Sequence, residues 1–512
     1  MPRVTHASAR SARLAGPPGS AAVAGGSAEV VAAATAILRA GGCAVDAALA
    51  AAFTAVMSEP VLASLGGGGF LLSADKDASP QVLDFFVDVP GLGGGSVEPH
   101  VETVVVDFAR TGSAATSSEQ VFHGGWGTVG TPGCLPGYLE AHRRFGRLPL
   151  AAIVGPAVGA ARAGVVLSDG QRTFLHLVSD LLNITADSRR LFAEAESSGV
   201  YRNEAYARLL EGLADGRIGG FDDPALAEPL LAGCRAGGGL LTAEDLAAYR
   251  PVTREPLALS RRGSRVWTNP PPSVGGSIVM ASLAGLAEEP SAIRWAEVAR
   301  ALADATLAQR GPGQVPTGTT HVSVVDAQGG FAALTTSNGS GSGTVLPGWD
   351  VALNNMLGEE DLRPADGSAL PPGTRMGSMM APTLVDLADG SRVALGTGGS
   401  ERIRSALLGV VLRLTDSGSE LLAAVDAPRV HLTGTGPVHV EPGFADDDLL
   451  ELAELARARD WPGLESWPAP SLFFGGVHAV RRSADGSIEA VGDARRTGAV
   501  GMVLPDGSIR TA

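Results

Sequence analysis

The sequence predicts a mixed α/β protein, because helical patterns fill much of the first 318 residues and strand patterns dominate the rest. Residues 27–40 and 44–57 are rich in alanine and are separated by two glycines, which predicts two helices joined by a tight turn. Residues 320–326 alternate and carry β-branched side chains, the pattern of a half-buried strand. The chain therefore changes character near residue 319.

The other elements follow from the same two periodicities. Thr242, with Asp245 three residues later, is typical of the first turn of a helix. Four glycines at 66–69 run directly into an apolar strand, and because no lysine or helix follows them, we expect close backbone packing beside a site rather than a phosphate loop. Helical spacing predicts further helices at 135–145, 150–163, 174–212, 277–286 and 403–414.

The composition excludes several classes of protein. Of the 512 residues, 45% are hydrophobic and 18% are charged, which excludes a disordered chain and permits a large core. The net charge of -15 argues against nucleic acid and anionic membranes as partners, since both recruit basic surfaces. A small-molecule substrate is therefore the expected partner.

The cysteines and histidines give no sign of a metal or a cofactor. Cys43, Cys134 and Cys234 are widely spaced and odd in number, as expected for reduced, buried thiols in the cytoplasm. The nine histidines form no metal-binding motif, so we expect no metal and no cofactor. The longest apolar run, 47–57, is too short to span a bilayer, and the broken N-terminal segment lacks the core of an export signal. These features predict a cytoplasmic protein.

The junction between Gly318 and Thr319 is the most informative point of the chain. Residues 310–318 contain prolines and glycines and indicate an exposed loop, whereas the strand begins immediately after them. If the chain were cut there, Thr319 would carry a free α-amino group that can act as the base for its own hydroxyl. The alternative is that Thr319 simply opens an ordinary strand.

A hairpin partner for this strand is predicted at residues 331–336. Residues 326–330 form a turn-like pentapeptide, so pairing about Gln328 places residue 325 opposite 331 and residue 321 opposite 335. The same register places Ser337 opposite Thr319, where its hydroxyl can hydrogen-bond and orient the threonine oxygen. A slip of one residue would remove this contact, and Ser337 would then lie in a turn.

Three polar clusters follow the hairpin. Residues 353–362 gather amides and carboxylates, among them Asn355, that can hold an amino group. Residues 375–383 present Ser378 ahead of a strand. Residues 396–403 form a glycine turn that enters a helix, and its N–H groups suit an oxyanion hole. Singly each is typical of a polar turn, but their order behind a candidate nucleophile indicates a site.

These motifs resemble those of the gamma-glutamyltransferase (gamma-glutamyl transpeptidase) family of N-terminal-nucleophile hydrolases, over nearly the whole chain. The resemblance implies a four-layer αββα sandwich and a precursor that cuts itself into a large chain of residues 1–318 and a small chain of 319–512, which stay together as a heterodimer. The motifs that carry it lie at 41–48, 66–70, 132–137, 240–249, 270–276, 319–326, 353–355 and 427–431.

The resemblance also implies roles for single residues. Thr319 matches the nucleophile that becomes acylated, and Ser337 or its neighbour matches the supporting hydroxyl. Asn338 matches a substrate-binding asparagine. Gly399 and Ser400 match the pair whose backbone N–H groups stabilise the oxyanion.

Further matches concern the substrate. Either Glu359 or Glu360 takes the place of the acid that holds the donor's α-amino group, and an extra Gly358 leaves open which of them it is. Typical members grip the donor carboxylate with an arginine that follows Leu-Asp-Phe, but here Phe86 follows. They also use two adjacent serines where this chain has only Ser378. The chain therefore predicts an acyl substrate other than glutathione.

Three functions are consistent with these residues. The first is a self-processing threonine hydrolase or acyltransferase that acts on an amide of a small amino-acid-like or other acyl substrate. The second, by resemblance to homologues proposed for the alkylproline branch of lincomycin and pyrrolobenzodiazepine biosynthesis, is a carbon–carbon bond hydrolase in antibiotic biosynthesis. The third is an unprocessed, inactive binding protein that keeps the fold.

Overall fold

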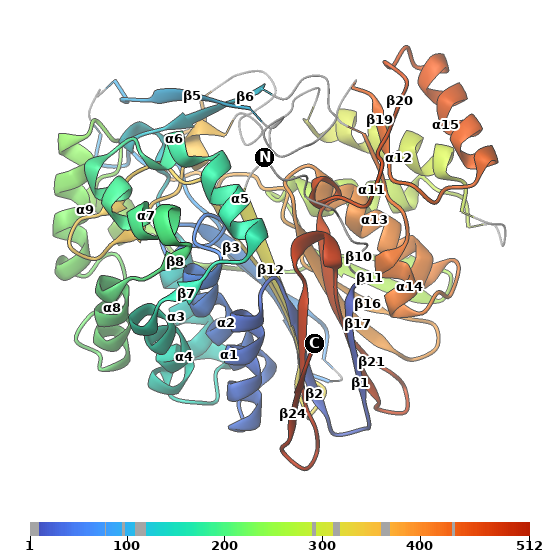
Figure 1. Cartoon of the computed structure of the whole chain (residues 1–512), viewed down its shortest axis with the longest axis horizontal. Helices are drawn as coiled ribbons and strands as arrows, with labels where there is room; N and C mark the ends of the chain where they lie inside the picture. The colour runs from blue at the N-terminus through green and yellow to red at the C-terminus, as the bar shows by residue number, and fades with distance from the viewer. Residues whose placement is uncertain are drawn as a thin grey trace.

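Two large antiparallel sheets form the centre of the molecule (Figure 1). The computed structural model describes residues 10–76, 78–94, 98–107, 119–288, 293–310, 318–359, 369–432 and 436–512. The eight-stranded sheet has the order β24 (Ile509–Thr511), β23 (Ala499–Val503), β2 (Ala21–Gly25), β12 (Gly318–Val325), β13 (Phe331–Gly339), β3 (Gly68–Ala74), β4 (Gln81–Phe85) and β9 (Val252–Arg254). The seven-stranded sheet has the order β1 (Ala12–Gly16), β22 (Ile488–Gly492), β21 (Gly476–Arg482), β17 (Arg392–Gly398), β16 (Thr383–Asp386), β11 (Ser264–Thr268) and β10 (Leu257–Arg261).

Smaller sheets and short helices surround these two. The short strands are β5 (Glu102–Asp107) with β6 (Glu119–Gly124), β7 (Val165–Val166) with β8 (Val200–Tyr201), β14 (Val345–Leu346) with β15 (Val351–Ala352), and the group β18 (Val430–Leu432), β19 (Val438–Val440) and β20 (Leu464–Ser466). The 3-10 helices are η2 (Trp126–Thr128), η3 (Met356–Gly358), η5 (Leu472–Phe474) and η6 (Ala494–Arg496).

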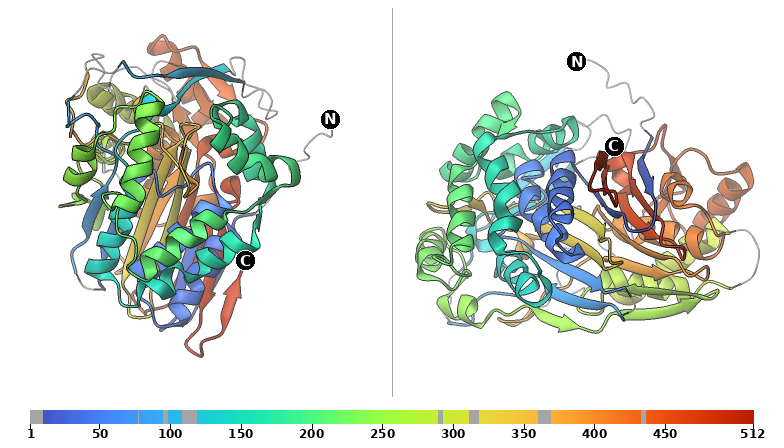
Figure 2. Two further views of the ribbon diagram at one scale, coloured as in Figure 1. Left: turned by 90° about the vertical axis from the view of Figure 1, so that its left-hand side faces the viewer. Right: turned by 90° about the horizontal axis from the view of Figure 1, so that it is seen from below.

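Helices flank both sheets. The sheets contact each other through β12, which touches β17 and β21, while α1 (Ala28–Arg39) and α2 (Ala44–Ser58) pack on the eight-stranded sheet. On the other side, α11 (Val274–Ala284) and α13 (Arg402–Thr415) contact the seven-stranded sheet, an arrangement that Figure 2 shows from two further directions. The predicted mixed α/β class, with antiparallel sheets, is confirmed.

The predicted helices of the first 318 residues are present. The helices not yet named are α3 (Cys134–Phe145), α4 (Leu150–Ala163), α5 (Asp169–Leu177), α6 (Ser179–Leu182), α7 (Ala186–Ser198), α8 (Glu204–Ala214), α9 (Pro224–Ala236), α10 (Ala243–Ala248) and α12 (Trp295–Arg310). Thr242 caps α10, and Asp245 reaches back to its backbone N–H at 2.8 Å, as the sequence predicts. The helix predicted at 277–286 begins three residues earlier, because Val274 N–H already bonds the carbonyl of Ser378.

The second part of the chain holds more helix than predicted. Besides the predicted helix at 403–414, seen as α13, it contains α14 (Leu421–Asp426) and α15 (Asp446–Ala458). Three aspartates open α15, where carboxylates favour the positive end of the helix dipole. The sequence analysis predicted only the first of these three helices.

The predicted hairpin is present with its predicted register. Val325 pairs with Phe331, His321 with Thr335, and Thr319 with Ser337. The prediction that β12 is half-buried is wrong, because all eight residues of the strand are buried. One face of β12 packs on α2 and the other on the opposite sheet, so the alternating side chains meet protein on both sides.

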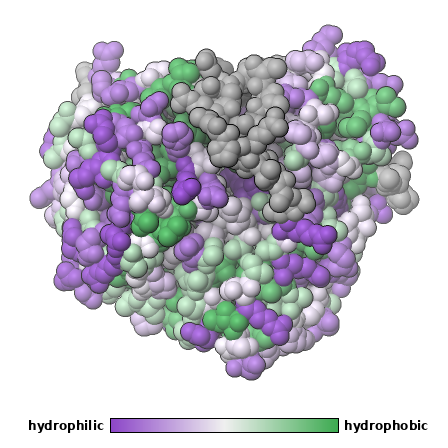
Figure 3. All heavy atoms as spheres, viewed as in Figure 1, coloured by the Kyte–Doolittle hydropathy of each residue, from purple (hydrophilic) through white to green (hydrophobic). Residues whose placement is uncertain are grey.

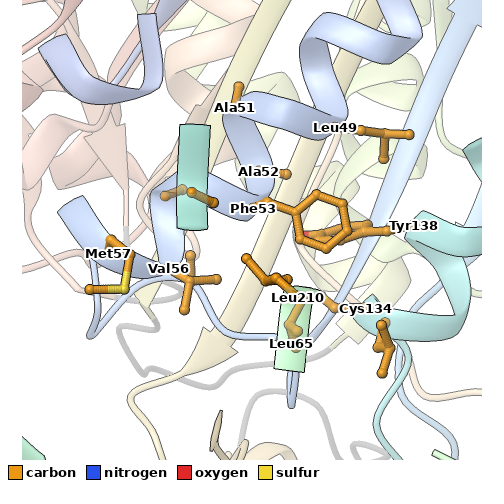
Figure 4. Close-up of a cluster of buried hydrophobic side chains, with 14 of the residues drawn as sticks. Leu49, Ala51, Ala52, Phe53, Val56, Met57, Leu65, Cys134, Tyr138 and Leu210 are labelled. Carbon is orange, nitrogen blue, oxygen red and sulfur yellow. The ribbon is translucent and has the colours of Figure 1, made fainter. Parts of the chain in front are cut away.

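The largest core lies between α2, α3 and the eight-stranded sheet. Figure 4 shows Phe53 and Tyr138 edge to face there, with ring centroids 5.2 Å apart, and Cys134 beside them. Cys134 and Cys234 are buried and Cys43 is half-buried, in accordance with the expected free thiols. On the face shown in Figure 3, hydrophilic residues alternate with smaller hydrophobic groups. Among the described residues, no helix combines the length and the apolar character needed to cross a bilayer.

Candidate active site

Thr319 lies at the first regular pair of the hairpin and is buried, with 2% of its surface exposed. Gly318 pairs with Gly339, and the register shifts between Gly318 and Thr319. The predicted loop before this point falls mostly on residues 311–317, which lie outside the described residues. The chain is thus irregular at the peptide bond that the sequence marks as a cleavage point.

The hydroxyl of Ser337 contacts this peptide bond. Its Oγ donates to the carbonyl oxygen of Gly318 at 2.5 Å and accepts from the N–H of Gly339 at 3.0 Å. The sequence predicted a bond to the threonine oxygen, but the observed acceptor lies one residue earlier. A donor in this position polarises the carbonyl group of Gly318, whose carbon is attacked when the chain is cut before Thr319.

The glycine run 66–69 packs directly behind Ser337, as expected. A Cβ on Gly67 would overlap the carbonyl oxygen of Ser337, and one on Gly69 would lie 2.5 Å from that of Thr335. Gly318 is restricted in the same way, because a Cβ there would overlap the carbonyl oxygen of Gly339. Backbone segments approach one another here at distances that only glycine permits.

Three of the predicted substrate-binding residues lie beside the same junction. Asn338 donates to the carbonyl of Leu353 at 3.4 Å, and its Oδ1 finds no hydrogen-bond partner within the described ranges. Asn355 accepts from the N–H of Ser340 at 2.9 Å. A Cβ on Gly339 would overlap Oδ1 of Asn355 and would lie 3.2 Å from Oε1 of Glu359.

Of the two candidate acids, Glu359 is therefore placed next to the residue that pairs with Gly318. Its side chain is buried, with 2% exposed. Glu360 lies outside the described residues.

Gly399 and Ser400 form the turn between β17 and α13. Both adopt positive φ, +129° and +53°, and only glycine adopts such values without strain. The residue before them, Gly398, packs so closely on β12 that a Cβ there would overlap the carbonyl oxygen of Thr319. The turn predicted to hold an oxyanion thus lies against the predicted nucleophile.

Ser378, a further predicted substrate-binding residue, lies beside the start of α11. Its carbonyl accepts from the hydroxyl of Ser273 at 3.1 Å, and its own Oγ accepts from the N–H of Met380 at 3.1 Å. Within the described part of the chain, these contacts tie Ser378 to the start of α11, and none of them reaches Thr319.

The position of the expected arginine is apolar. Phe86 is 1% exposed and stacks on Phe70, with ring centroids 5.7 Å apart. The nearby Arg375 is already engaged, since its guanidinium binds the carboxylates of Asp84 and Asp88. Phe86 and Phe70 therefore place buried apolar side chains where the resemblance led us to expect an arginine.

Two charged residues at the site were missed by the sequence analysis. Arg496 donates from Nη1 to the carbonyl oxygen of Thr319 at 3.3 Å, and Glu59, at the end of α2, is fully buried behind Thr320. The available signal was a glutamate at the end of the apolar run 47–57, because a charge in such surroundings needs a function or a partner.

Comparisons with known proteins show to which family the chain belongs. The family model described as gamma-glutamyltranspeptidase matches residues 31–306 and 287–503, which is most of the chain. The chain belongs to this family. It is 30% identical to the glutathione hydrolase proenzyme of Pseudomonas aeruginosa, over 77% of this chain and 80% of that protein.

Two further relatives of this gamma-glutamyltranspeptidase family member are acylases. The acylase ACY 1 proenzyme of a Pseudomonas species is 28% identical over 88% of each chain. The crystal structure of cephalosporin acylase from Bacillus halodurans has the same fold, with a TM-score of 0.78 and 23% identity over 100% of this chain and 98% of that one. The protein is an enzyme of the hydrolase or acyltransferase type.

Proposed function

We propose that the protein is a self-processing threonine hydrolase or acyltransferase that acts on an amide of a small acyl substrate other than glutathione. It cuts itself before Thr319, and chains 1–318 and 319–512 then form the αββα sandwich of the N-terminal-nucleophile type together. Relatives named as proenzymes support the processing step. Thr319, Ser337, Gly399 and Ser400 form the reacting part of the site, and Asn338, Asn355 and Glu359 bind the substrate.

The observation that carries the proposal is the hydrogen bond from Ser337 to the carbonyl of Gly318. Oγ of Thr319 adds to the carbonyl carbon of Gly318, the C–N bond breaks, and the hydroxyl proton passes to the nitrogen. Water then hydrolyses the resulting ester, which releases the carboxylate of Gly318 and regenerates the hydroxyl of Thr319 beside the amine that the first step has freed. A donor at the carbonyl oxygen stabilises the negative charge that both steps develop.

The mature enzyme repeats this chemistry on its substrate. The free amine of Thr319 takes the hydroxyl proton while Oγ attacks the acyl carbon, and it returns the proton to the leaving amine. The N–H groups of the Gly399-Ser400 turn bind the oxyanion. Water, or a second amine, then resolves the acyl-enzyme.

The described side chains that pack around Phe86 are apolar and offer no charged partner for a glutamyl α-carboxylate. This supports a substrate whose acyl group lacks that carboxylate. A charge-assisted contact contributes about 1.5–3 kcal/mol, so losing it together with one serine hydroxyl weakens binding by roughly ten- to several-hundred-fold. The names of the acylase relatives point in the same direction.

Denaturing electrophoresis and mass spectrometry test the proposal. Wild-type protein should give two chains, the smaller beginning at Thr319, and Thr319→Ala should remain intact. Thr320→Ala is the matched control, because this neighbouring hydroxyl faces Glu59 on the other side of the strand, and it should still be cut. An intact wild-type chain that is correctly folded would identify the inactive binding protein instead.

Two anilides then define the substrate. We expect slow release of p-nitroaniline from the γ-glutamyl anilide and faster release from an acyl anilide that lacks the α-carboxylate. If the processed enzyme cleaves neither anilide but converts an alkylproline-type precursor, the carbon–carbon hydrolase is the correct function.

A further inference from the structure

Arg496 connects the nucleophile with the glycine turn. It lies in η6 and is half-buried, and its Nη1 donates to the carbonyl oxygen of Thr319 at 3.3 Å. The same Nη1 lies 2.8 Å from the point where Gly398 would carry a Cβ, and Nη2 lies 3.4 Å from the corresponding point of Gly399. The guanidinium of Arg496 therefore contacts both β12, at Thr319, and the end of β17, at Gly398.

The turn that carries Arg496 is held firmly. Asp493 precedes η6, and its carboxylate binds the guanidinium of Arg429 and accepts the N–H of Val477 at 2.9 Å. On the other side of Arg496, the hydroxyl of Thr497 donates to the carbonyl of Gly26 at 2.9 Å. The cation is thus fixed with respect to β12.

Among the described residues, Glu59 is the opposing charge that acts most strongly on Arg496. Its side chain is 2% exposed, and its Oε1 has no hydrogen-bond partner among them. A Cβ on Gly26 would lie 2.9 Å from both carboxylate oxygens of Glu59, so the backbone at Gly26 packs directly against this carboxylate. Burial raises the pKa of Glu59 to about 7, although the hydroxyl of Thr320 and the cation of Arg496 lower it.

Other charged groups also act on this pair. Burial, followed by the repulsion of Arg402, lowers the pKa of Arg496 to about 10, so this residue stays cationic at neutral pH. His321, two residues beyond Thr319, stays neutral because burial lowers its pKa well below 6.5. Glu29 on α1, Arg429 and Asp493 also act on the pair, and Glu359 lies beside Gly339.

We propose that Arg496 and Glu59 are positioning residues that set the protonation of the Thr319 α-amine, an inference that rests on the proposed cleavage before Thr319. The carbonyl oxygen that Arg496 holds is separated from the amine nitrogen by three covalent bonds, so the cation lies within about 7.5 Å of the amine. A cation at this distance disfavours the ammonium form, and the carboxylate of Glu59 favours it.

The amine can act as a base only when it is unprotonated, and an ordinary α-amine has a pKa of about 7.7–8.0. Arg496 shifts this pKa downward by roughly one unit, as expected for a charge at that distance in surroundings of intermediate polarity. Holding the Thr319 carbonyl also fixes the rotation that places the amine beside Oγ. Arg496 and Glu59 together therefore orient the Thr319 amine and adjust its pKa.

The pKa of the amine can be measured without knowledge of the substrate. Cyanate carbamylates unprotonated amines, and the mass of the small chain reports carbamylation at Thr319 as a function of pH. We expect Arg496→Gln to raise the midpoint of this profile by roughly one pH unit and Arg496→Lys to stay near wild type. Glu59→Gln should lower the midpoint by a few tenths of a unit, because Glu59 itself titrates near neutrality.

The control is Arg482→Gln, which makes the same charge change at the far end of β21. The near end of this strand, Gly476, pairs with Gly398 and lies six residues before Arg482. Its midpoint should equal that of the wild type. Unchanged midpoints in Arg496→Gln and Glu59→Gln would overturn the inference, while wild-type cleavage would still support the proposed function. If Arg496→Gln remains one chain, the profile of Glu59→Gln decides alone: no downward shift refutes the inference.

Discussion

The contact between Gly398 and Thr319 offers a sharp test of how the two sheets position the nucleophile. In Gly398→Ala, the new methyl group would overlap the carbonyl oxygen of Thr319 and lie 2.8 Å from Nη1 of Arg496. To restore ordinary contact distances, β12 and β17 must separate by roughly 1 Å at this point. Because both strands are buried backbone, no flexible side chain can absorb the change.

Overpacking of this kind costs about 1–3 kcal/mol of folding free energy, and a displacement of 1 Å costs on the order of 100-fold in rate. We therefore expect Gly398→Ala to fold with reduced stability and to mature at most about one hundredth as fast as the wild type. Pulse-labelled protein followed on denaturing gels measures the rate, and urea titration measures the stability.

The matched control is Gly155→Ala in α4. Apart from its own helix backbone, no described atom lies within 4 Å of its Cβ position, so the helix should gain up to about 1 kcal/mol and maturation should be unchanged. Maturation of Gly398→Ala at the wild-type rate would refute the role assigned to the close approach of the two sheets at Thr319.

Three further results are expected. Ser337→Ala should slow maturation on the order of 100-fold, whereas Ser337→Thr, which keeps the hydroxyl, should lose less; equal rates for both on a gel would contradict the contact with Gly318. The folded state raises the pKa of Glu59 from 4.5 to about 7, so wild-type stability falls as pH rises through this range. In the single-chain Thr319→Ala background, urea titrations should therefore show that the free energy of unfolding of Glu59→Gln, relative to the protein that keeps Glu59, rises by up to about 3 kcal/mol between pH 4.5 and 8. A difference that stays constant with pH would argue against the raised pKa of Glu59. Burial raises the pKa of Cys134 to about 12, so this thiol should react with a disulfide reagent at pH 8 only after unfolding.

The sequence was most informative where structure is local. The turn at 326–330 and the alternation on either side determine the register of β12 and β13, so the partner of Thr319 could be predicted from about twenty residues. Capping by Thr242 is local in the same sense. The burial of β12 on both faces could not be predicted, because its pattern is the same whether the second face meets water or another sheet.

Residues that reach the site from distant parts of the chain could not be predicted. Arg496 contacts Thr319 across 177 positions, and its arginine-rich surroundings resemble an exposed turn. The role of Ser378 comes only from a resemblance of motifs, which carries no distance, and the hydrogen bonds of this residue join it to the start of α11. The basis for finding such residues lies in burial: a charge that the fold encloses must be paired or used.

The order of strands explains how the two chains would stay together after cleavage. In the eight-stranded sheet, β12 and β13 from the second chain lie between β2 and β3 from the first, and β2 in turn pairs with β23 of the second. Each chain therefore supplies strands that hydrogen-bond to the other on more than one edge, and separating them would expose the buried faces of a continuous sheet. Cutting one peptide bond removes none of these contacts. We expect the two chains to co-elute in gel filtration at high salt and to separate only in denaturant; separation under native conditions would show that the sheet does not hold them together.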